Sequence, residues 1–116
     1  MKDNANTILK IDQTQGILRL LLNDPKNKNA LSDQMMIQLK DQLFQASSND
    51  SIKVIIIAAV GDVFCSGHNL KDITDARSNA DDGKSYFLDL FNLCSSLMQM
   101  IVNCSKPVIA EVNGIA

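Results

Sequence analysis

The only histidine of the chain lies in a short segment whose residue types could hold a ligand. The segment reads GDVFCSGHNL and spans residues 61–70, with Cys65 and Ser66 directly before Gly67 and His68. Gly67 permits a backbone conformation, or a close approach of backbone to ligand, that other residues do not allow. If the residues after His68 begin a helical turn, the unpaired amides at its start can hold an anion or a polarised carbonyl oxygen. The segment is therefore a candidate site built from backbone N–H groups.

A plain turn is the competing interpretation of the same segment. A glycine-bearing loop follows a strand in almost every α/β protein, and a lone histidine there is more often a partly exposed loop residue than a base. No carboxylate close to His68 in the sequence would form an acid–base dyad with it. No base beside Cys65 would activate its thiol as a nucleophile. Spacing alone leaves both interpretations open.

The apolar pattern around the segment predicts an α/β domain. Residues 52–59 are apolar on both faces, which is typical of a strand that is buried on both sides and has parallel neighbours. The expected elements, in chain order, are strands at 7–12 and 17–22, a helix at about 32–46, a strand at 52–59, a helix at 85–102 and a strand at 108–112. Strands separated by helices require crossover connections. The polar stretch LKDITDARSNADDGK at 70–84 is expected to be a mobile connection.

Composition excludes several functional classes. The chain has 116 residues, of which 46% are hydrophobic and 21% charged, as in ordinary globular domains. Its net charge of −2 gives no reason to expect nucleic acid as a partner. The three cysteines show no metal-ligand spacing, and with no secretory signal they favour reduced thiols and a cytoplasmic location. No apolar run approaches the ~20 residues of a membrane span, so no transmembrane helix is expected.

The end of the chain is unusual for a domain of this class. Ala116 follows directly after a predicted buried strand at 108–112 and an Asn-Gly turn. A sheet seldom stops at such a point. We therefore expect residues 1–116 to be the N-terminal part of a single domain that is cut short after Ala116.

Three segments, in this order and spacing, resemble the crotonase (enoyl-CoA hydratase/isomerase) superfamily. They read LNDPKNKNALSDQMM, IKVIIIAAVGDVFCSGHNLKDI and KPVIAEVNGIA, and the likeness covers nearly the whole chain from about Thr7. The SGHNL and VNGIA stretches are most like the enoyl-CoA hydratase domain-containing branch. The resemblance implies the N-terminal part of the crotonase-like ββα spiral fold. It also implies an acyl-CoA-processing enzyme, most simply an enoyl-CoA hydratase acting in fatty acid metabolism.

The resemblance assigns the chemistry to a backbone group. Members of this superfamily stabilise a thioester enolate with two backbone N–H groups, and the first maps onto His68, whose imidazole would only shape the acyl pocket. The second N–H group and the catalytic glutamates of true hydratases map beyond Ala116. A crotonase-type isomerase, a thioester hydrolase and a non-catalytic acyl-CoA-binding protein therefore remain possible. Glu111 lies before the positions of those glutamates, so we expect a structural carboxylate there, for which a lysine is a suitable partner.

The resemblance also implies contacts with coenzyme A, as part of the substrate, and no metal or separate cofactor. The matching positions are Lys26, Lys28, Ala30, Ser66, Gly67, His68, Asn69, Leu70 and Lys71. The two lysines suit the phosphates of the nucleotide, although lysines in a polar loop are often merely solvated. Asn69 departs from the aspartate that is usual in the superfamily. A homotrimer or a dimer of trimers is the expected assembly, with no membrane partner.

Overall fold

The structure is a computed structural model that describes residues 7–68 and 70–115, without the side chains of 70–72. It begins with the expected hairpin, in which β1 (Leu9–Thr14) pairs with β2 (Ile17–Leu22) in antiparallel register. The turn between the strands places both of its residues in the left-handed region, with φ of 52° at Gln15 and 82° at Gly16. Glycine adopts this region freely, which explains why the turn ends in glycine.

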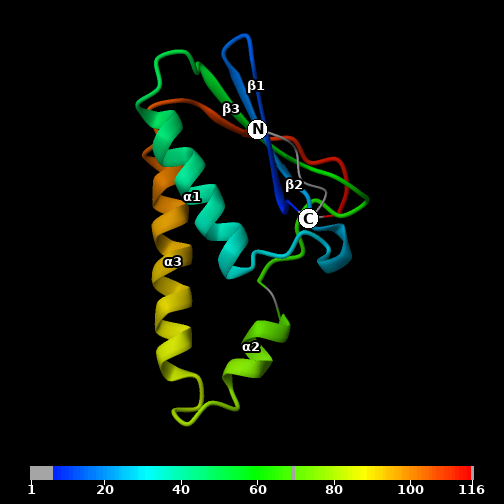
Figure 1. The fold of residues 1–116 in the computed structure, drawn as a ribbon, viewed down its shortest axis with the longest axis vertical. Helices are drawn as coiled ribbons and strands as arrows, with labels where there is room; N and C mark the ends of the chain where they lie inside the picture. The colour runs from blue at the N-terminus through cyan, green and yellow to red at the C-terminus, as the bar shows by residue number, and fades with distance from the viewer. Residues whose placement is uncertain (1–6, 69, 116) are drawn as a thin grey trace.

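The fold contains a four-stranded sheet with the strand order β1-β2-β3-β4 (Figure 1). β3 (Val54–Ala59) and β4 (Val108–Ala110) both run parallel to their neighbours, with Leu18 of β2 opposite Ile55 of β3. The two parallel pairs confirm the crossover connections that the alternation of strands and helices predicts. β4 is shorter than the strand expected at 108–112.

The first helix, α1 (Asp33–Ser47), covers one face of the sheet. It begins where expected, because the Ser32 hydroxyl accepts a hydrogen bond of 3.2 Å from the backbone N–H of Met35 and caps the helix. The buried apolar side chains of α1 and the buried side chains of β2 form one core cluster, made of Met35, Met36, Leu39, Leu43, Ala46, Leu18, Leu20 and Leu22. α3 (Lys84–Val102) runs beside α1 and adds Leu90 and Leu97 to this core.

A second helix lies where a mobile connection was predicted. α2 (Leu70–Ala76) and the first turns of α3 form an arm that extends away from the sheet (Figure 1). The Asp81 carboxylate accepts hydrogen bonds from the backbone N–H groups of Gly83 and Ser85, and so caps α3. A Cβ on Gly83 would lie 2.8 Å from the carbonyl oxygen of Ala76, so glycine is what allows the two helices to approach closely. The prediction failed because α2 is too short to show a helical period.

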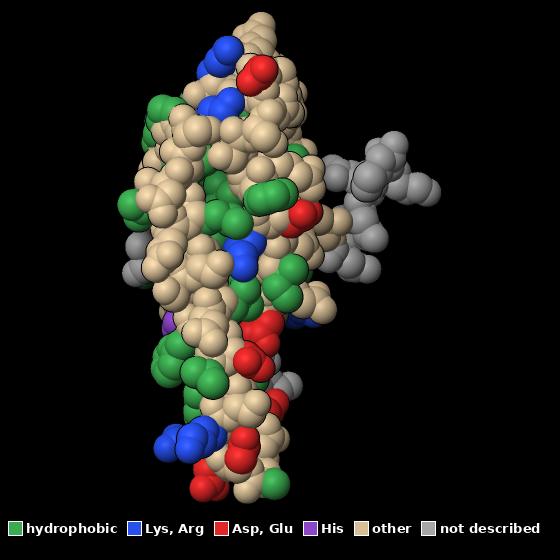
Figure 2. Space-filling model, turned by 90° about the vertical axis from the view of Figure 1, so that its left-hand side faces the viewer, with side chains coloured by type: hydrophobic (Ala, Val, Ile, Leu, Met, Phe, Trp, Pro, Cys, Tyr) green, Lys and Arg blue, Asp and Glu red, His purple; other side chains and the backbone are tan. Residues whose placement is uncertain are grey.

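Part of the apolar surface is uncovered, contrary to expectation. β3 was predicted to be buried on both faces, but Val54 and Ile56 are half-buried and the neighbouring Ile109 is 50% exposed. On α3, Phe91 is 63% exposed although its helical spacing predicts a core position. Figure 2 shows hydrophobic side chains among charged ones on the face turned toward the viewer.

The same helix corrects the expectation that no segment could span a membrane. Within the described residues, α3 has 19 residues with a mean hydropathy of 1.2, which is long and apolar enough for a span. Core helices of soluble proteins meet this criterion as well, although only 11% of this window is buried here. The absence of a membrane partner therefore stays a prediction.

Candidate functional site

The first part of the site is the polar loop between β2 and α1. Pro25–Asn27 form a single 3-10 turn, which closes with a hydrogen bond of 3.0 Å from the Lys28 N–H to the Pro25 carbonyl. Lys28 and Asn29 then follow with φ of 55° and 53°, in the left-handed region. Asparagine tolerates this region better than most residues. Two successive left-handed residues turn the chain sharply before α1.

The second part is the segment after β3, which runs alongside the first loop. The backbone N–H of Ser66 donates to the Lys28 carbonyl at 3.2 Å, and that of Leu31 donates to the Gly67 carbonyl at 2.6 Å. Leu31 and His68 form an isolated parallel bridge. We call residues 24–31 and 60–68 the paired loops, because these backbone bonds join them side by side.

The segment after β4 braces the paired loops from the other side. The N–H of Ile115 donates to the Asp62 carbonyl at 3.2 Å, and the N–H of Phe64 donates to the Ile115 carbonyl at 2.7 Å. The Asn113 side chain donates to the carbonyl of Ala59, the last residue of β3, at 3.4 Å. The three sequence segments that share a likeness therefore meet in space, around the loop that contains His68.

Within the described residues, the backbone N–H of His68 makes none of the hydrogen bonds that tie the residues before it. The bridge to Leu31 uses the Gly67 carbonyl, and no described residue accepts a hydrogen bond from the His68 N–H. Gly67 has φ of 96°, and a Cβ at this position would meet no atom within 4 Å. The glycine is therefore needed for backbone conformation and not for space. A donor that follows a fixed segment and has no acceptor among the described residues can receive a ligand oxygen.

The imidazole of His68 has no acid–base partner in the part of the chain that the structure describes. Its Nδ1 atom is buried without a hydrogen bond, and no described carboxylate contacts it. Cys65 likewise shows no activating base, since its Sγ accepts a hydrogen bond of 3.4 Å from the Gly67 N–H. Among the described residues, the two side chains that attract attention in the sequence thus lack the partners that catalysis by a side chain requires.

The residues expected to contact coenzyme A differ in exposure and in how far the structure describes them. Lys26, Lys28 and Ser66 are exposed on the paired loops, whereas Ala30 is buried, with 5% of its surface accessible. The structure brings these residues together with Gly67 and His68 through the bonds between the loops. Asn69 lies outside the described residues. Leu70 and Lys71 begin α2, and their side chains are likewise not described.

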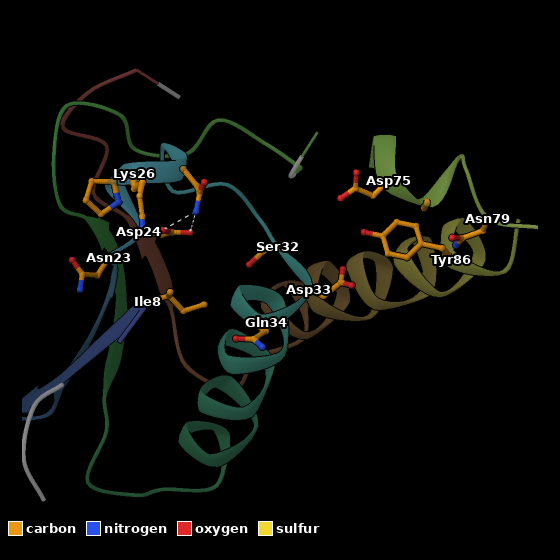
Figure 3. A pocket seen from close by; sticks show the side chains of 13 residues that line it. Ile8, Asn23, Asp24, Lys26, Ser32, Asp33, Gln34, Asp75, Asn79 and Tyr86 are labelled. Carbon is orange, nitrogen blue, oxygen red and sulfur yellow. Dashed lines mark hydrogen bonds between the residues drawn. The ribbon is translucent and has the colours of Figure 1, made fainter. Parts of the chain in front are cut away.

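A large open cavity of about 1070 Å³ lies beside the first loop, between that loop and the arm formed by α2 and α3 (Figure 3). Of the residues predicted to bind coenzyme A whose side chains the structure describes, Lys26 alone lines it. Asp24, Asp33 and Asp75 reach it from the loop, from α1 and from α2. Three carboxylates disfavour the phosphates of a nucleotide, so this cavity is a poorer place for them than the exposed lysine-bearing surface of the loop.

Glu111 has a structural partner, as expected, but the partner is an arginine. Its carboxylate accepts a hydrogen bond of 2.9 Å from Arg19 on β2, with side chains 51% and 33% exposed. Through this hydrogen bond, and then through its charge, Arg19 lowers the pKa of Glu111, and Glu111 raises the pKa of Arg19 in the same way. The pair lies on the sheet face that α1 does not cover, away from the paired loops.

No group of three or more metal-ligating side chains occurs among the residues that the structure describes. All three cysteines are free thiols. The sequence missed one residue of the site, Asn29, whose side chain is fully buried between the paired loops. In the sequence it is one polar residue in a polar loop, so the only available signal was that asparagine is suited to a left-handed turn.

Comparisons with known proteins place these observations in context. The family model described as enoyl-CoA hydratase/isomerase matches residues 12–116. Enoyl-CoA hydratase domain-containing protein 3, mitochondrial, from Xenopus laevis is 43% identical over 106 residues, which cover 91% of this chain and 34% of that protein. The 1,2-epoxyphenylacetyl-CoA isomerase of Escherichia coli is 31% identical over 103 residues, covering 88% of this chain and 38% of the relative.

The solved structures agree with this result. The crystal structure of human enoyl-CoA hydratase domain-containing protein 3 superimposes with a TM-score of 0.82 at 37% identity, over 93% of this chain and 41% of that one. The architecture is therefore the N-terminal part of the crotonase-like fold, as the sequence segments predict. The chain spans about a third of the length of the first relatives that it matches.

Proposed function

Because the chain belongs to the enoyl-CoA hydratase/isomerase family, we propose that its paired loops bind an acyl-CoA thioester and take part in the hydration of an enoyl-CoA. One observation supports this proposal above the others. The backbone N–H of His68 has no acceptor among the described residues, while the backbone directly before it is tied to the first loop through Ser66 and Gly67. Such a donor is suited to hold the oxygen of a thioester as negative charge develops on it.

The proposed reaction asks little of the side chains on this chain. The oxygen of water bonds to C3 and gives up one proton, the π electrons of the double bond move toward the thioester, and C2 then gains a proton. Between these events the electron pair rests on the thioester oxygen as an enolate, which the His68 N–H stabilises. A preorganised backbone donor needs no protonation state and does not reorganise during the reaction, and one such donor is worth about 10²–10³ in kcat.

The substrate is held through its coenzyme A portion. Lys26 and Lys28 are exposed on the first loop and are the cationic groups available there for phosphates. Coenzyme A enters as part of the substrate, and the proposal requires no metal and no separate cofactor. The side chain of Ser66 is exposed on the facing loop and completes the proposed contact surface.

The proposal is tested by a matched pair of glycine variants in the full chain. Gly67→Ala and Gly16→Ala each place a methyl group at a positive φ, of 96° and 82°, so both carry a similar conformational cost. Gly16 lies in the remote β1–β2 turn, where the nearest atom to a Cβ is the flexible Cγ of Lys53, at 3.1 Å. Hydration of crotonyl-CoA is followed by the loss of absorbance of the conjugated thioester, and binding by titration with acetoacetyl-CoA.

We expect Gly67→Ala to lower kcat by about tenfold or more, because it moves the proposed donor, while Gly16→Ala keeps the wild-type rate. Equal rates for the two variants would remove the loop from the site. Failure of the wild-type protein to bind acetoacetyl-CoA at millimolar concentration would refute the acyl-CoA proposal. Binding without turnover would leave a non-catalytic acyl-CoA-binding protein.

Isomerisation is the second candidate reaction, and the likeness to 1,2-epoxyphenylacetyl-CoA isomerase favours it over thioester hydrolysis. An enolate intermediate serves both hydration and isomerisation, so the N–H of His68 would act in the same way. Assaying a 3-enoyl-CoA beside crotonyl-CoA separates the two reactions. Product formed from the 3-enoyl-CoA but not from crotonyl-CoA would identify an isomerase.

Assembly and location are further parts of the proposal. We propose a homotrimer or a dimer of trimers, which light scattering of the full chain would test. The cytoplasmic location rests on the three free thiols, whereas the Xenopus laevis and human relatives carry the word mitochondrial in their names. Both compartments are compatible with reduced cysteines, and cell fractionation distinguishes them.

A further inference from the structure

Asn29 is the one polar side chain that is fully buried among the residues with described surroundings, with 0% of its surface exposed. Burying an amide without partners is costly, so such a residue must gain its hydrogen bonds inside the protein. Neither the sequence segments nor the comparisons assign a role to this side chain. Its hydrogen bonds show what it does.

The Asn29 amide joins the two loops through all of its polar atoms. Its Oδ1 atom accepts a hydrogen bond of 2.7 Å from the backbone N–H of Asp24, within its own loop. Its Nδ2 atom donates to the carbonyl of Val60 at 3.0 Å and to that of Val63 at 2.8 Å, both in the facing loop. One side chain therefore fixes the start of the second loop against the start of the first.

The backbone bonds between the loops lie directly beside this side chain. Lys28, on one side of Asn29, accepts from the Ser66 N–H at 3.2 Å. Leu31, two residues after Asn29, donates to the Gly67 carbonyl at 2.6 Å. Asn29 thus stands between the residues that hold Ser66 and Gly67 in place. The N–H of His68 follows immediately after the second of these bonds.

We propose that Asn29 is a positioning residue that holds the paired loops in one register and thereby fixes the backbone N–H of His68. What that N–H does rests on the proposed function, whereas the coupling of the loops does not. Donors that act on developing charge must be held in place before the reaction, and a displacement of about 1 Å can cost about 10²-fold in rate. Asn29 touches neither substrate nor reacting atoms, and it acts through the loop that it holds.

Asparagine is the residue type that fits this position. The φ of 53° disfavours most side chains, and the site offers two carbonyl acceptors and one N–H donor to the side chain. Aspartate has nearly the same shape but would lose both donors and place a carboxylate against two carbonyl oxygens. An apolar residue would leave all three backbone groups buried without partners.

The test compares Asn29→Gly with Gln15→Gly in the full chain. Both variants remove a side chain at a left-handed position, with φ of 53° and 52°, but Gln15 lies in the remote and exposed β1–β2 turn. Hydrogen exchange is measured without ligand over residues 28–31 and 60–68, and kcat and KM are measured with crotonyl-CoA. If Asn29→Gly does not fold, Asn29→Asp provides the same comparison.

We expect Asn29→Gly to speed exchange of the Ser66 and Leu31 amides by at least about tenfold, while exchange in α1 and β3 stays at the wild-type rate. We expect kcat to fall by about 10–100-fold with a smaller change in KM, because the donor is displaced and not removed. Gln15→Gly should change neither quantity.

The two hypotheses fail separately. Unchanged exchange in both loops overturns the role of Asn29, whatever the substrate. If Asn29→Gly lowers the free energy of unfolding but leaves kcat unchanged, the positioning role is also overturned, because Asn29 would then be a purely structural residue. If wild-type protein binds no acyl-CoA while Asn29→Gly still frees the loops, the proposed function fails and the coupling stands.

Discussion

Replacing Gly114 by alanine tests how closely the segment after β4 is packed against the paired loops. A Cβ at this position would overlap the carbonyl oxygen of Asp62 and lie 2.8 Å from its carbonyl carbon. Both atoms belong to the backbone, so no side-chain rotation can relieve the contact. The segment must move away from the loop. The hydrogen bonds that join Ile115 to Asp62 at 3.2 Å and to Phe64 at 2.7 Å would then lengthen or break.

The expected loss of stability follows from these two effects. Overpacking costs about 1–3 kcal/mol in a well-packed core, and each backbone hydrogen bond contributes a net of about 0.5–1.5 kcal/mol. Since Gly114 and Asp62 are exposed, movement of the segment relieves most of the overlap while it weakens the two bonds, and we expect Gly114→Ala to lower the free energy of unfolding by about 1–3 kcal/mol. This is a large part of the ~5–15 kcal/mol that a domain has in total.

Urea unfolding of the full chain, followed by circular dichroism, measures this quantity. Ile115→Ala is the matched control, because it trims a side chain that is 72% exposed and leaves the backbone bonds in place. It should change stability by less than about 0.5 kcal/mol. In the absence of a clash, Gly→Ala is neutral or stabilising by about 0.4–1 kcal/mol, since it restricts the unfolded chain. An unchanged or higher stability for Gly114→Ala would therefore refute the close packing.

Three further predictions concern single interactions. Ser32→Ala removes the cap that accepts from the Met35 N–H and should lower the free energy of unfolding by about 1 kcal/mol, measured in the same urea assay. Glu111→Gln should destabilise the protein at neutral pH and low salt. Because Arg19 lowers the pKa of Glu111, the greater stability of the wild type is present above the ordinary pKa of 4.5 and is lost as the pH falls through the lowered pKa. A stability difference between wild type and variant that persists at pH 2 would contradict this origin. Lys28→Ala should weaken acyl-CoA binding by about two- to fivefold and reduce its salt dependence, as judged by calorimetric titration at two ionic strengths, and equal salt dependence would exclude a phosphate contact.

The sequence predicted the elements whose residue pattern is long and repeated. The apolar pattern located α1 almost to the residue, and β2 was predicted with its observed bounds. α2 was missed because a helix of seven residues is too short to repeat an apolar pattern. Its last residue, Ala76, is buried within the arm with 5% of its surface exposed, which the sequence alone does not indicate. Short elements of this kind are specified by tertiary contacts and not by local pattern.

Burial was the least predictable property, for a physical reason. Helical spacing predicts which residues of α3 share a face, and Leu90 and Leu97 do reach the core. The same spacing cannot tell how wide a strip of α3 the neighbouring α1 will cover, and Phe91 and Met98 are 63% and 42% exposed. Periodicity fixes direction around a helix, whereas burial depends on what packs against it.

The candidate site was predicted through its backbone more than through its side chains. His68 and Cys65 are the residues with the most reactive groups, yet neither has the partners that side-chain catalysis needs within the described part of the chain. Gly67 and Asn29 have no reactive group, and each adopts a left-handed conformation that few other residues tolerate. The constraint on residue type in these loops is therefore mainly conformational: glycine gives the turn before the N–H group, and asparagine adds the hydrogen bonds that hold it. In the proposed site, where a backbone donor acts, the positions that set the conformation of the loops should matter as much as those that touch the substrate, which is why loop exchange and kcat, measured together, are the observables that can locate it.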